Sequence, residues 1–160
     1  MLRAAVLLFA CAVAQAAPVF QIRFPGSLRA TPAAGRLIVV VSTDLNAEPR
    51  QLVTWSVRTQ QVFAIDVDGW APGQPARVDE SAAGHPLASL KDLPPGKYRV
   101  QAVLHVYETV RRADGHTLKV PWDDGEGQQW DRSPGNLVST PQDVEIGPGS
   151  YVGDEAAIGT

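Results

Sequence analysis

The sequence predicts an all-β fold, an immunoglobulin-like β-sandwich of about seven to eight strands that is preceded by a signal peptide. The 160 residues include 14 glycines and 13 prolines, which is above the roughly 12% share of these residues in average globular chains. Short runs of alternating apolar and polar residues recur between turn signals, and no stretch keeps the 3.6-residue period of an amphipathic helix. Together these observations favour many short strands joined by turns.

Residues 1–16 have the layout of a cleavable secretory signal peptide. Arg3 precedes an apolar run of ten residues, Ala4–Val13, and the small residues of Ala14–Ala16 place the cleavage after Ala16. As a helix, ten residues span only about 15 Å, half the thickness of a bilayer core. We therefore expect an exported protein, periplasmic or extracellular, with no membrane span.

The same leader allows a second interpretation, a lipoprotein signal acylated at Cys11. Phe9 is bulky where such sites usually carry a small residue, so the sequence favours cleavage instead. Cleavage removes Cys11, the only cysteine, so the remaining chain has no disulfide and no thiolate. We expect residues 17–147 to form the β-sandwich domain and residues 148–160 to be a tail or the start of a linker.

Four strands are expected in the first half of this domain. Phe20–Phe24 alternates apolar and polar side chains, and Arg36–Ser42 is a β-branched run that predicts a strand buried on both faces. Leu52–Val57 alternates in the same way, which would place Trp55 in the core. Gln61–Val67 is a further short β-type run.

The second half contains the strongest strand signal, Lys97–Tyr107, in which Tyr98, Val100, Ala102 and Leu104 would share one face. Asp114-Gly115 predicts a hairpin turn after it. Ala88–Leu93 could form one helical turn. The other expected strands are Ala76–Asp79, Thr117–Val120 and Thr140–Ile146.

The entry to the strongest strand refines the fold class. Pro95-Gly96 supplies a tight turn, and Tyr98 follows at the position of a tyrosine corner, in which a tyrosine hydroxyl bonds back to upstream backbone in immunoglobulin-like sandwiches. An ordinary hairpin strand with an inward tyrosine is the alternative. Both interpretations are β-structure.

The sequence contains no recognisable catalytic constellation. Ser133 and Ser150 come nearest to a nucleophile elbow, but neither has both flanking glycines, and Ser133 is better interpreted as a turn residue. His85, His105 and His116 lack the spacing of zinc ligands, and His105 is expected to point outward from its strand. A net charge of −3 provides no basic surface for nucleic acid. We expect no enzyme activity, no cofactor and no metal.

An acidic, glycine-rich loop is the one segment that could hold a cation. Asp123, Asp124, Glu126 and Asp131 lie close together, and calcium takes carboxylate and carbonyl oxygens from flexible loops. Their spacing does not match the EF-hand loop, so a solvated acidic turn is the better interpretation.

Three of the four tryptophans, Trp70, Trp122 and Trp130, lie in or beside predicted loops. Three interpretations stay open: caps over the sandwich, contacts with a partner protein, or platforms on which sugar rings stack. The candidate contact surface is therefore Trp70, Trp122 and Trp130, together with the acidic loop residues Asp123, Asp124 and Glu126.

Five segments in order resemble the N-terminal region of secreted bacterial esterases of the enterochelin-esterase-like type. The resemblance covers roughly residues 18–146 and rests on Asp66–Trp70, Leu93–Leu104, Arg112–His116, Gly125–Gly127 and Ser133–Leu137. It implies a sandwich that precedes an α/β-hydrolase domain carrying the catalytic residues. Since this chain has no such motif, the resemblance implies a non-catalytic accessory or interaction module, either a truncated or split product or a stand-alone copy. A glycan- or cell-wall-binding module is the alternative.

Overall fold

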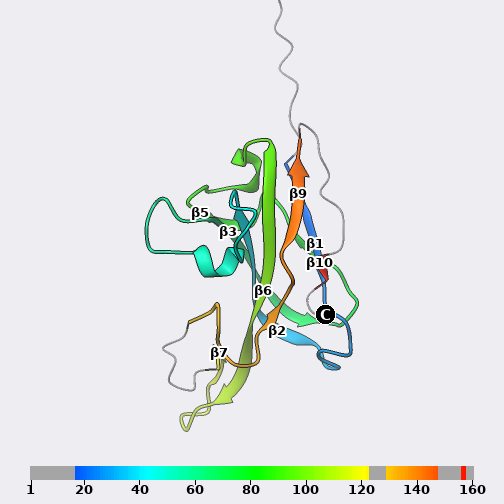
Figure 1. Ribbon diagram of the computed structural model, residues 1–160. Helices are drawn as coiled ribbons and strands as arrows, with labels where there is room; N and C mark the ends of the chain where they lie inside the picture. Colours follow the sequence, from blue (N-terminus) through cyan, green and yellow to red (C-terminus); the bar gives the residue numbers. More distant parts are fainter. Residues whose placement is uncertain (1–16, 123–128, 148–155, 158–160) are drawn as a thin grey trace, which may run out of the picture.

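The computed structural model describes residues 17–122, 129–147 and 156–157, and these form an all-β protein (Figure 1). The larger sheet has the order β5-β3-β2-β6-β7, with β8 and β9 also paired to β6, and the smaller sheet has the order β10-β1-β4. The strands are β1 Phe20–Arg23, β2 Ala33–Ser42, β3 Gln61–Trp70, β4 Ala76–Val78, β5 Ala83–His85, β6 Gly96–Arg111, β7 Thr117–Pro121, β8 Leu137–Val138, β9 Gln142–Ile146 and β10 Ala156–Ala157.

The strand order confirms the predicted immunoglobulin-like sandwich. The neighbours β9, β6, β2 and β3 follow the order G-F-C-C′ of an immunoglobulin sheet, and the antiparallel pair of β1 and β4 corresponds to strands B and E of the facing sheet. β6 is the central strand, since it pairs with β2 over Arg99–Val106 and with β9 over Gly96–Val100. In this correspondence β6 is strand F.

The main core lies between the two sheets. Alternate residues of every long strand point into it, so the period-2 pattern of the sequence becomes one continuous apolar layer. On β6 this layer consists of Tyr98, Val100, Ala102 and Leu104, as predicted, and also of Val106. Its largest fully buried members are Phe24, Phe63, Ile22, Leu37, Leu90, Leu104 and Ile146.

The outer face of the larger sheet is covered as well. A short 3-10 helix, η1 (Pro49–Leu52), and the segment 129–139 lie over it, and Ile38, Val40 and Val103 are buried beneath them. The prediction that Arg36–Ser42 is buried on both faces is therefore confirmed, apart from the exposed Arg36.

His105 lies on the outer face of its strand, as predicted, but it is covered there by another segment of the chain. Its side chain is only 5% exposed, and Nδ1 lies 3.4 Å from the carbonyl oxygen of Trp130 in the covering segment. Strand alternation places His105 on the outer face correctly, but alternation in one strand cannot show that a segment 25 residues later folds over that face.

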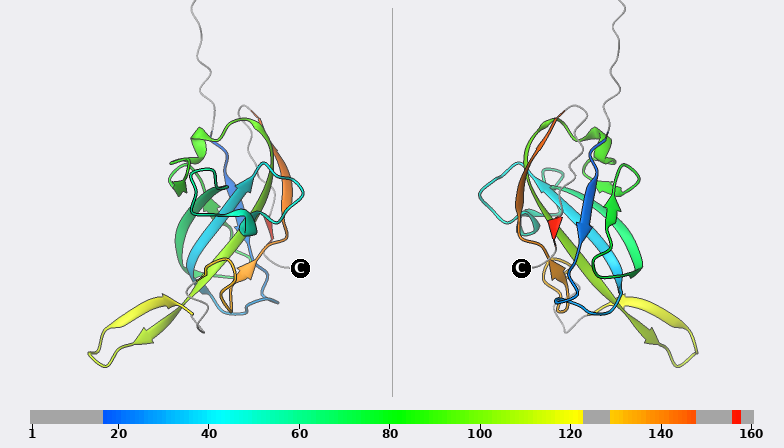
Figure 2. Two further views of the ribbon diagram at one scale, coloured as in Figure 1. Left: turned by 60° about the vertical axis from the view of Figure 1, so that its left-hand side comes forward. Right: turned by 90° about the vertical axis from the view of Figure 1, so that its right-hand side faces the viewer.

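β6 and β7 form a two-stranded ribbon that extends beyond the sandwich (Figure 2). The hairpin turn is the predicted one: Gly115 N donates to Arg112 O at 3.0 Å, and Gly115 has a φ of 87°, a conformation that favours glycine. The strands of this hairpin run further than expected, to Arg111 on β6 and to Pro121 on β7.

Other differences lie in short elements. The strand predicted at Leu52–Val57 is absent, because this stretch is the end of η1 followed by a loop. The two-residue strand β10 lies in the expected tail and pairs parallel with β1. The expected helical turn is the 3-10 helix η2, Leu90–Asp92. The predicted signal peptide, residues 1–16, lies outside the described residues.

Candidate functional site

The loop of residues 53–60, between η1 and β3, bulges away from the sandwich (Figure 1). Its shape is set by hydroxyl groups: Thr54 N donates to Thr59 Oγ1 at 2.7 Å, and Arg58 N donates to Ser56 Oγ at 3.2 Å. Thr59 is buried and closes the base of the loop, and its own N–H donates to Ser56 O at 3.0 Å. These bonds use the polar groups of the loop internally and leave its apolar side chains facing water.

Trp55 is the most exposed large apolar residue of the described chain. Its exposure is 106% of the extended reference, and Val57 on the same tip is 81% exposed. The prediction that Trp55 belongs to the core is therefore wrong. Within the described residues, Leu52–Val57 pairs with no strand of either sheet, and polar groups of the loop bond to one another instead.

Trp70 has the opposite environment and is removed from the candidate contact surface. It is the last residue of β3 and is only 6% exposed. The strand continues as far as Trp70 because Gly69 adopts a φ of 65°, a backbone conformation that glycine adopts without strain. The indole meets the ring of Phe24 edge to face, with centroids 4.8 Å apart. Its Nε1 donates to Gln74 O at 2.9 Å, so both the apolar and the polar parts of the side chain are satisfied.

The other candidate contact residues have mixed outcomes. Trp122 directly follows Pro121, the last residue of β7, and is 46% exposed. Trp130 is half-buried, and its carbonyl oxygen accepts a hydrogen bond from Asn136 Nδ2 at 2.6 Å. Asp123, Asp124 and Glu126 lie outside the described residues, so the structure does not test the calcium alternative.

The tyrosine corner has the predicted geometry. Tyr98 Oη donates to the carbonyl oxygen of Pro94 at 2.7 Å, four residues upstream, and the side chain is buried at the start of β6. The turn residues Pro95 and Gly96 let the chain fold back over the ring: the nearest atoms to a Cβ added at Gly96 would be those of Tyr98. Burial raises the pKa of the phenol above its ordinary value of 10.

A hydrogen-bonded network holds η1 on the outer face and so fixes the base of the Trp55 loop. Glu48 accepts from Arg50 Nε at 2.6 Å and from Gln101 Nε2 at 2.8 Å, while Gln101 Oε1 accepts from Arg50 N at 3.0 Å. Gln101 is buried and also donates to Ser139 O at 3.0 Å. The hydrogen bond from Arg50, followed by that from Gln101, holds the pKa of Glu48 below its ordinary value.

An open groove of about 410 Å³ lies between residues 46–48 and 138–141 and is lined in part by Arg99. The guanidinium of Arg99 donates to Leu45 O, and its Nε lies 3.0 Å from Asp143 Oδ1, within ion-pair distance though not aligned for a hydrogen bond. The charge of Arg99 is thus balanced within the protein, and the groove does not define a ligand chemistry.

Ser133 occupies a turn, where its Oγ donates to Gln129 O at 3.0 Å. Among residues 17–122, 129–147 and 156–157, no group of three His, Cys, Asp or Glu side chains lies close enough together to hold a metal ion. Within the same described part of the chain, no helix has the length and apolar character needed to cross a membrane.

Comparisons with protein-family models, with curated proteins and with solved structures find no match to this chain. The fold is therefore what is established for this protein: it is an all-β immunoglobulin-like sandwich. The resemblance to the N-terminal region of enterochelin-esterase-like enzymes stays a prediction.

Proposed function

We propose that this protein is an exported, non-catalytic interaction module whose partner is an α/β-hydrolase domain, and that the Trp55 loop is its contact site. The partner class follows from the resemblance of the sequence to the N-terminal region of esterases. The contact site follows from the full exposure of Trp55 and Val57 on a loop with internal hydrogen bonds. The exposure of Trp55 is the observation on which this proposal rests.

The composition of the tip suits a protein partner. Tryptophan and arginine are the residues most enriched among those that dominate binding energy at protein interfaces, and Arg58 adds an exposed guanidinium beside Trp55 and Val57. Because the tip is convex, it needs a concave and apolar acceptor on the other protein. The hydroxyl groups that shape the loop also pre-organise it, which lowers the entropy lost on binding.

The test is to titrate the purified protein into a purified α/β-hydrolase domain of the esterase family and to measure heat of binding. We expect a one-to-one complex that Trp55→Ala weakens by about 30-fold or more, the loss typical of a dominant interface residue. Leu28→Ala is the matched control, since Leu28 is also exposed but lies on another loop. Absence of a complex with the unmodified protein, or equal losses for both variants, would refute the proposal.

A second candidate function, glycan or cell-wall binding, is favoured by the same residue. An indole that is exposed on both faces can stack on a sugar ring, because the ring presents a patch of C–H groups to the aromatic face. Titration with a panel of polysaccharides while following tryptophan fluorescence tests it. A shift that Trp55→Ala abolishes would support glycan binding, and no shift across the panel would exclude it.

A further inference from the structure

The ribbon formed by β6 and β7 has one apolar face. Strand alternation places Glu108, Val110, Leu118 and Val120 on one side, with Val110 paired to Leu118 and Glu108 paired to Val120. This side continues the inner face of the sandwich, since Leu104 and Val106 precede it in the same alternation and are buried. Beyond Val106 the apolar side chains become 37–44% exposed.

The β7 edge of the ribbon is protected against further strand pairing. β7 carries Lys119 and Pro121, the two residue types with which natural proteins block an exposed strand edge. Lys119 is also engaged in an ion pair with Asp68. An incoming surface is therefore expected to pack on the face of the ribbon rather than to extend the sheet at β7.

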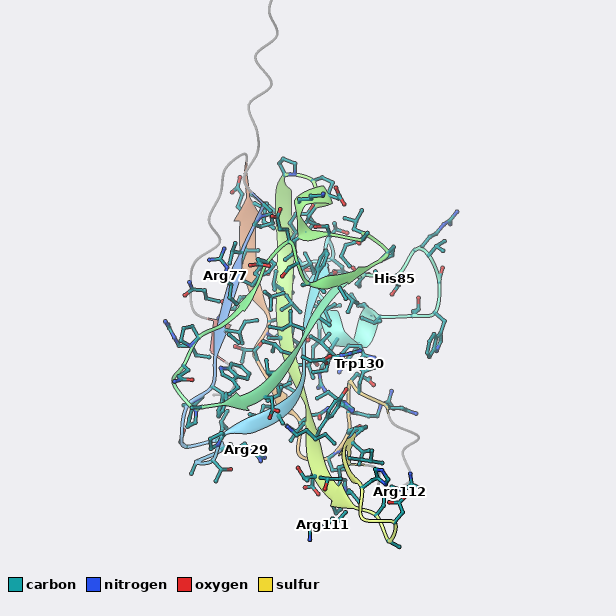
Figure 3. All side chains as sticks on the ribbon, turned by 180° about the vertical axis from the view of Figure 1, so that it is seen from behind. Arg29, Arg77, His85, Arg111, Arg112 and Trp130 are labelled. Carbon is teal, nitrogen blue, oxygen red and sulfur yellow. The ribbon has the colours of Figure 1, made fainter. Side chains whose placement is uncertain are left out.

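The charges on the apolar face are arranged with opposite signs at its two ends. Glu108 lies toward the sandwich. Arg112 directly follows the last residue of β6 and lies at the tip, where its N–H donates to His116 O at 2.8 Å and so continues the pairing of the ribbon by one rung. Arg112 has only a loose contact inside the turn, 3.5 Å from Asp114 to its Nη2. The adjacent Arg111 lies on a different side of the ribbon (Figure 3). A surface that complements this face must offer apolar side chains at its centre, a cation opposite Glu108 and an anion opposite Arg112.

A second copy of the same ribbon offers that arrangement. If two ribbons pack face to face and antiparallel, with a twofold axis at the rung of Val110 and Leu118, each Glu108 lies opposite the partner's Arg112. The parallel arrangement would instead gather both Glu108 side chains at one end and both Arg112 side chains at the other, with no opposite charges in contact, which disfavours it. The twofold axis also makes the contact closed and self-complementary, as in most homodimers.

We propose that two copies of this protein associate through the apolar faces of their β6–β7 ribbons, with Val110 and Leu118 at the centre and Glu108–Arg112 pairs at both ends. With strands about 4.8 Å apart and a rise of about 3.3 Å per residue, each face offers roughly 300 Å² including side chains. This is less than half the roughly 800 Å² per partner of a standard interface. The dimer is therefore weak, with a Kd on the order of 100 µM. The inference does not depend on the proposed function.

Sedimentation equilibrium of the purified protein over about 10 to 500 µM, concentrations that bracket this Kd, is the test. We expect a reversible monomer–dimer equilibrium that Leu118→Ser abolishes and that Thr109→Ser, on the opposite face of the ribbon, leaves intact. Arg112→Glu is expected to weaken dimerisation about tenfold, since it creates two like-charge contacts per dimer. Arg111→Glu makes the same charge change outside the contact and is the matched control.

The charge exchange provides the decisive variant. Glu108→Arg alone should weaken the dimer as Arg112→Glu does, and the double variant with both changes should restore it to within about threefold, because the pairs are re-formed with reversed sign. The proposal is overturned by a protein that stays monomeric at the highest concentration. It is also overturned if Arg111→Glu weakens the dimer as much as Arg112→Glu, or if the double variant is not rescued.

Discussion

The hydroxyl group of Tyr98 ties the start of β6 to the segment that leads into it. Its acceptor, Pro94 O, belongs to a proline, and the chain turns between the two residues through Pro95-Gly96. The bond therefore fixes the connection at the point where the central strand of the larger sheet begins. Because Pro94 itself is exposed, its carbonyl oxygen can accept from water when the bond is lost, so the loss costs the net contribution of one hydrogen bond.

Tyr98→Phe removes this hydroxyl and little else. We expect a loss of about 1 kcal/mol in the free energy of unfolding at neutral pH, measured by urea denaturation. Because burial raises the pKa of Tyr98 in the folded state, its contribution is complete below about pH 10 and is lost as the pH rises above that value. The difference between the two proteins should therefore shrink in alkaline solution, and a difference that does not change with pH would contradict this account.

Trp55 and Trp70 are expected to differ sharply in their effect on stability. Trp70→Ala removes a buried indole that contacts Phe24 and bonds Gln74, so we expect it to cost about 3–5 kcal/mol. Trp55→Ala removes a side chain that is surrounded by water, and its effect should stay within about 0.5 kcal/mol. Urea unfolding of both variants measures this. A large loss for Trp55→Ala would mean that its side chain is buried in the protein.

At the scale of single elements, η1 depends on one carboxylate. Glu48→Gln removes the charge that accepts from Arg50 and Gln101, and we expect it to cost about 1 kcal/mol at pH 7 because the site is partly exposed. The pKa of Glu48 lies below its ordinary value of 4.5 in the fold, so its contribution is present above that pH and is lost as the pH falls through the lowered value.

The measurement for this prediction is urea unfolding of the wild type and of Glu48→Gln at pH 7 and at pH 3. Other carboxylates such as Asp66 and Asp79, whose pKa values are also lowered, destabilise both proteins equally in acid. Only the gap between the two proteins reports on Glu48. An equal gap at both pH values would show that its charge does not hold η1 in place.

The long strands could be predicted from the sequence because their residues have a consistent environment over many positions. The β-branched run of β2 and the alternation of β6 each extend over seven or more residues that face a core. Leu52–Val57 shows the same alternation over six residues, but a strand also requires a free edge, and a one-dimensional pattern carries no information about edges. The short strands β5, β8 and β10 have two or three residues each, too few for any period to be visible.

The contact surface was harder to predict for a related reason. A tryptophan between two valines has the same local sequence whether it lies in a core or on a loop tip, so the pattern alone predicts a core position for Trp55. Trp70 follows Asp68-Gly69, a turn signal that here lies inside a strand. Pro49 was an available signal for Trp55, because proline favours the first position of a helix and marks η1 just before the loop.

At the scale of the whole molecule, the two proposed contact sites belong to opposite faces of the larger sheet. The apolar ribbon face continues the inner, sandwich-facing side, whereas η1, which leads into the Trp55 loop, covers the outer side. A dimer through the ribbons would leave both Trp55 tips free. A dimer that carries two Trp55 loops would bind more strongly to a partner or polymer with repeated sites, without any new contact.

Whether the proposed binding and dimerisation take place outside the cytoplasm depends on the first 16 residues. The short apolar run Ala4–Val13 and the small residues before Ala17 predict removal by a signal peptidase. We expect the intact mass of the protein isolated from a secreting host to correspond to a chain that begins at Ala17. A mass that begins at an acylated Cys11 would establish the lipoprotein alternative and place the sandwich at a membrane surface. A mass that includes Met1–Ala16, in protein recovered from the cytoplasm, would refute export and with it the expected meeting with a secreted hydrolase or a cell-wall glycan.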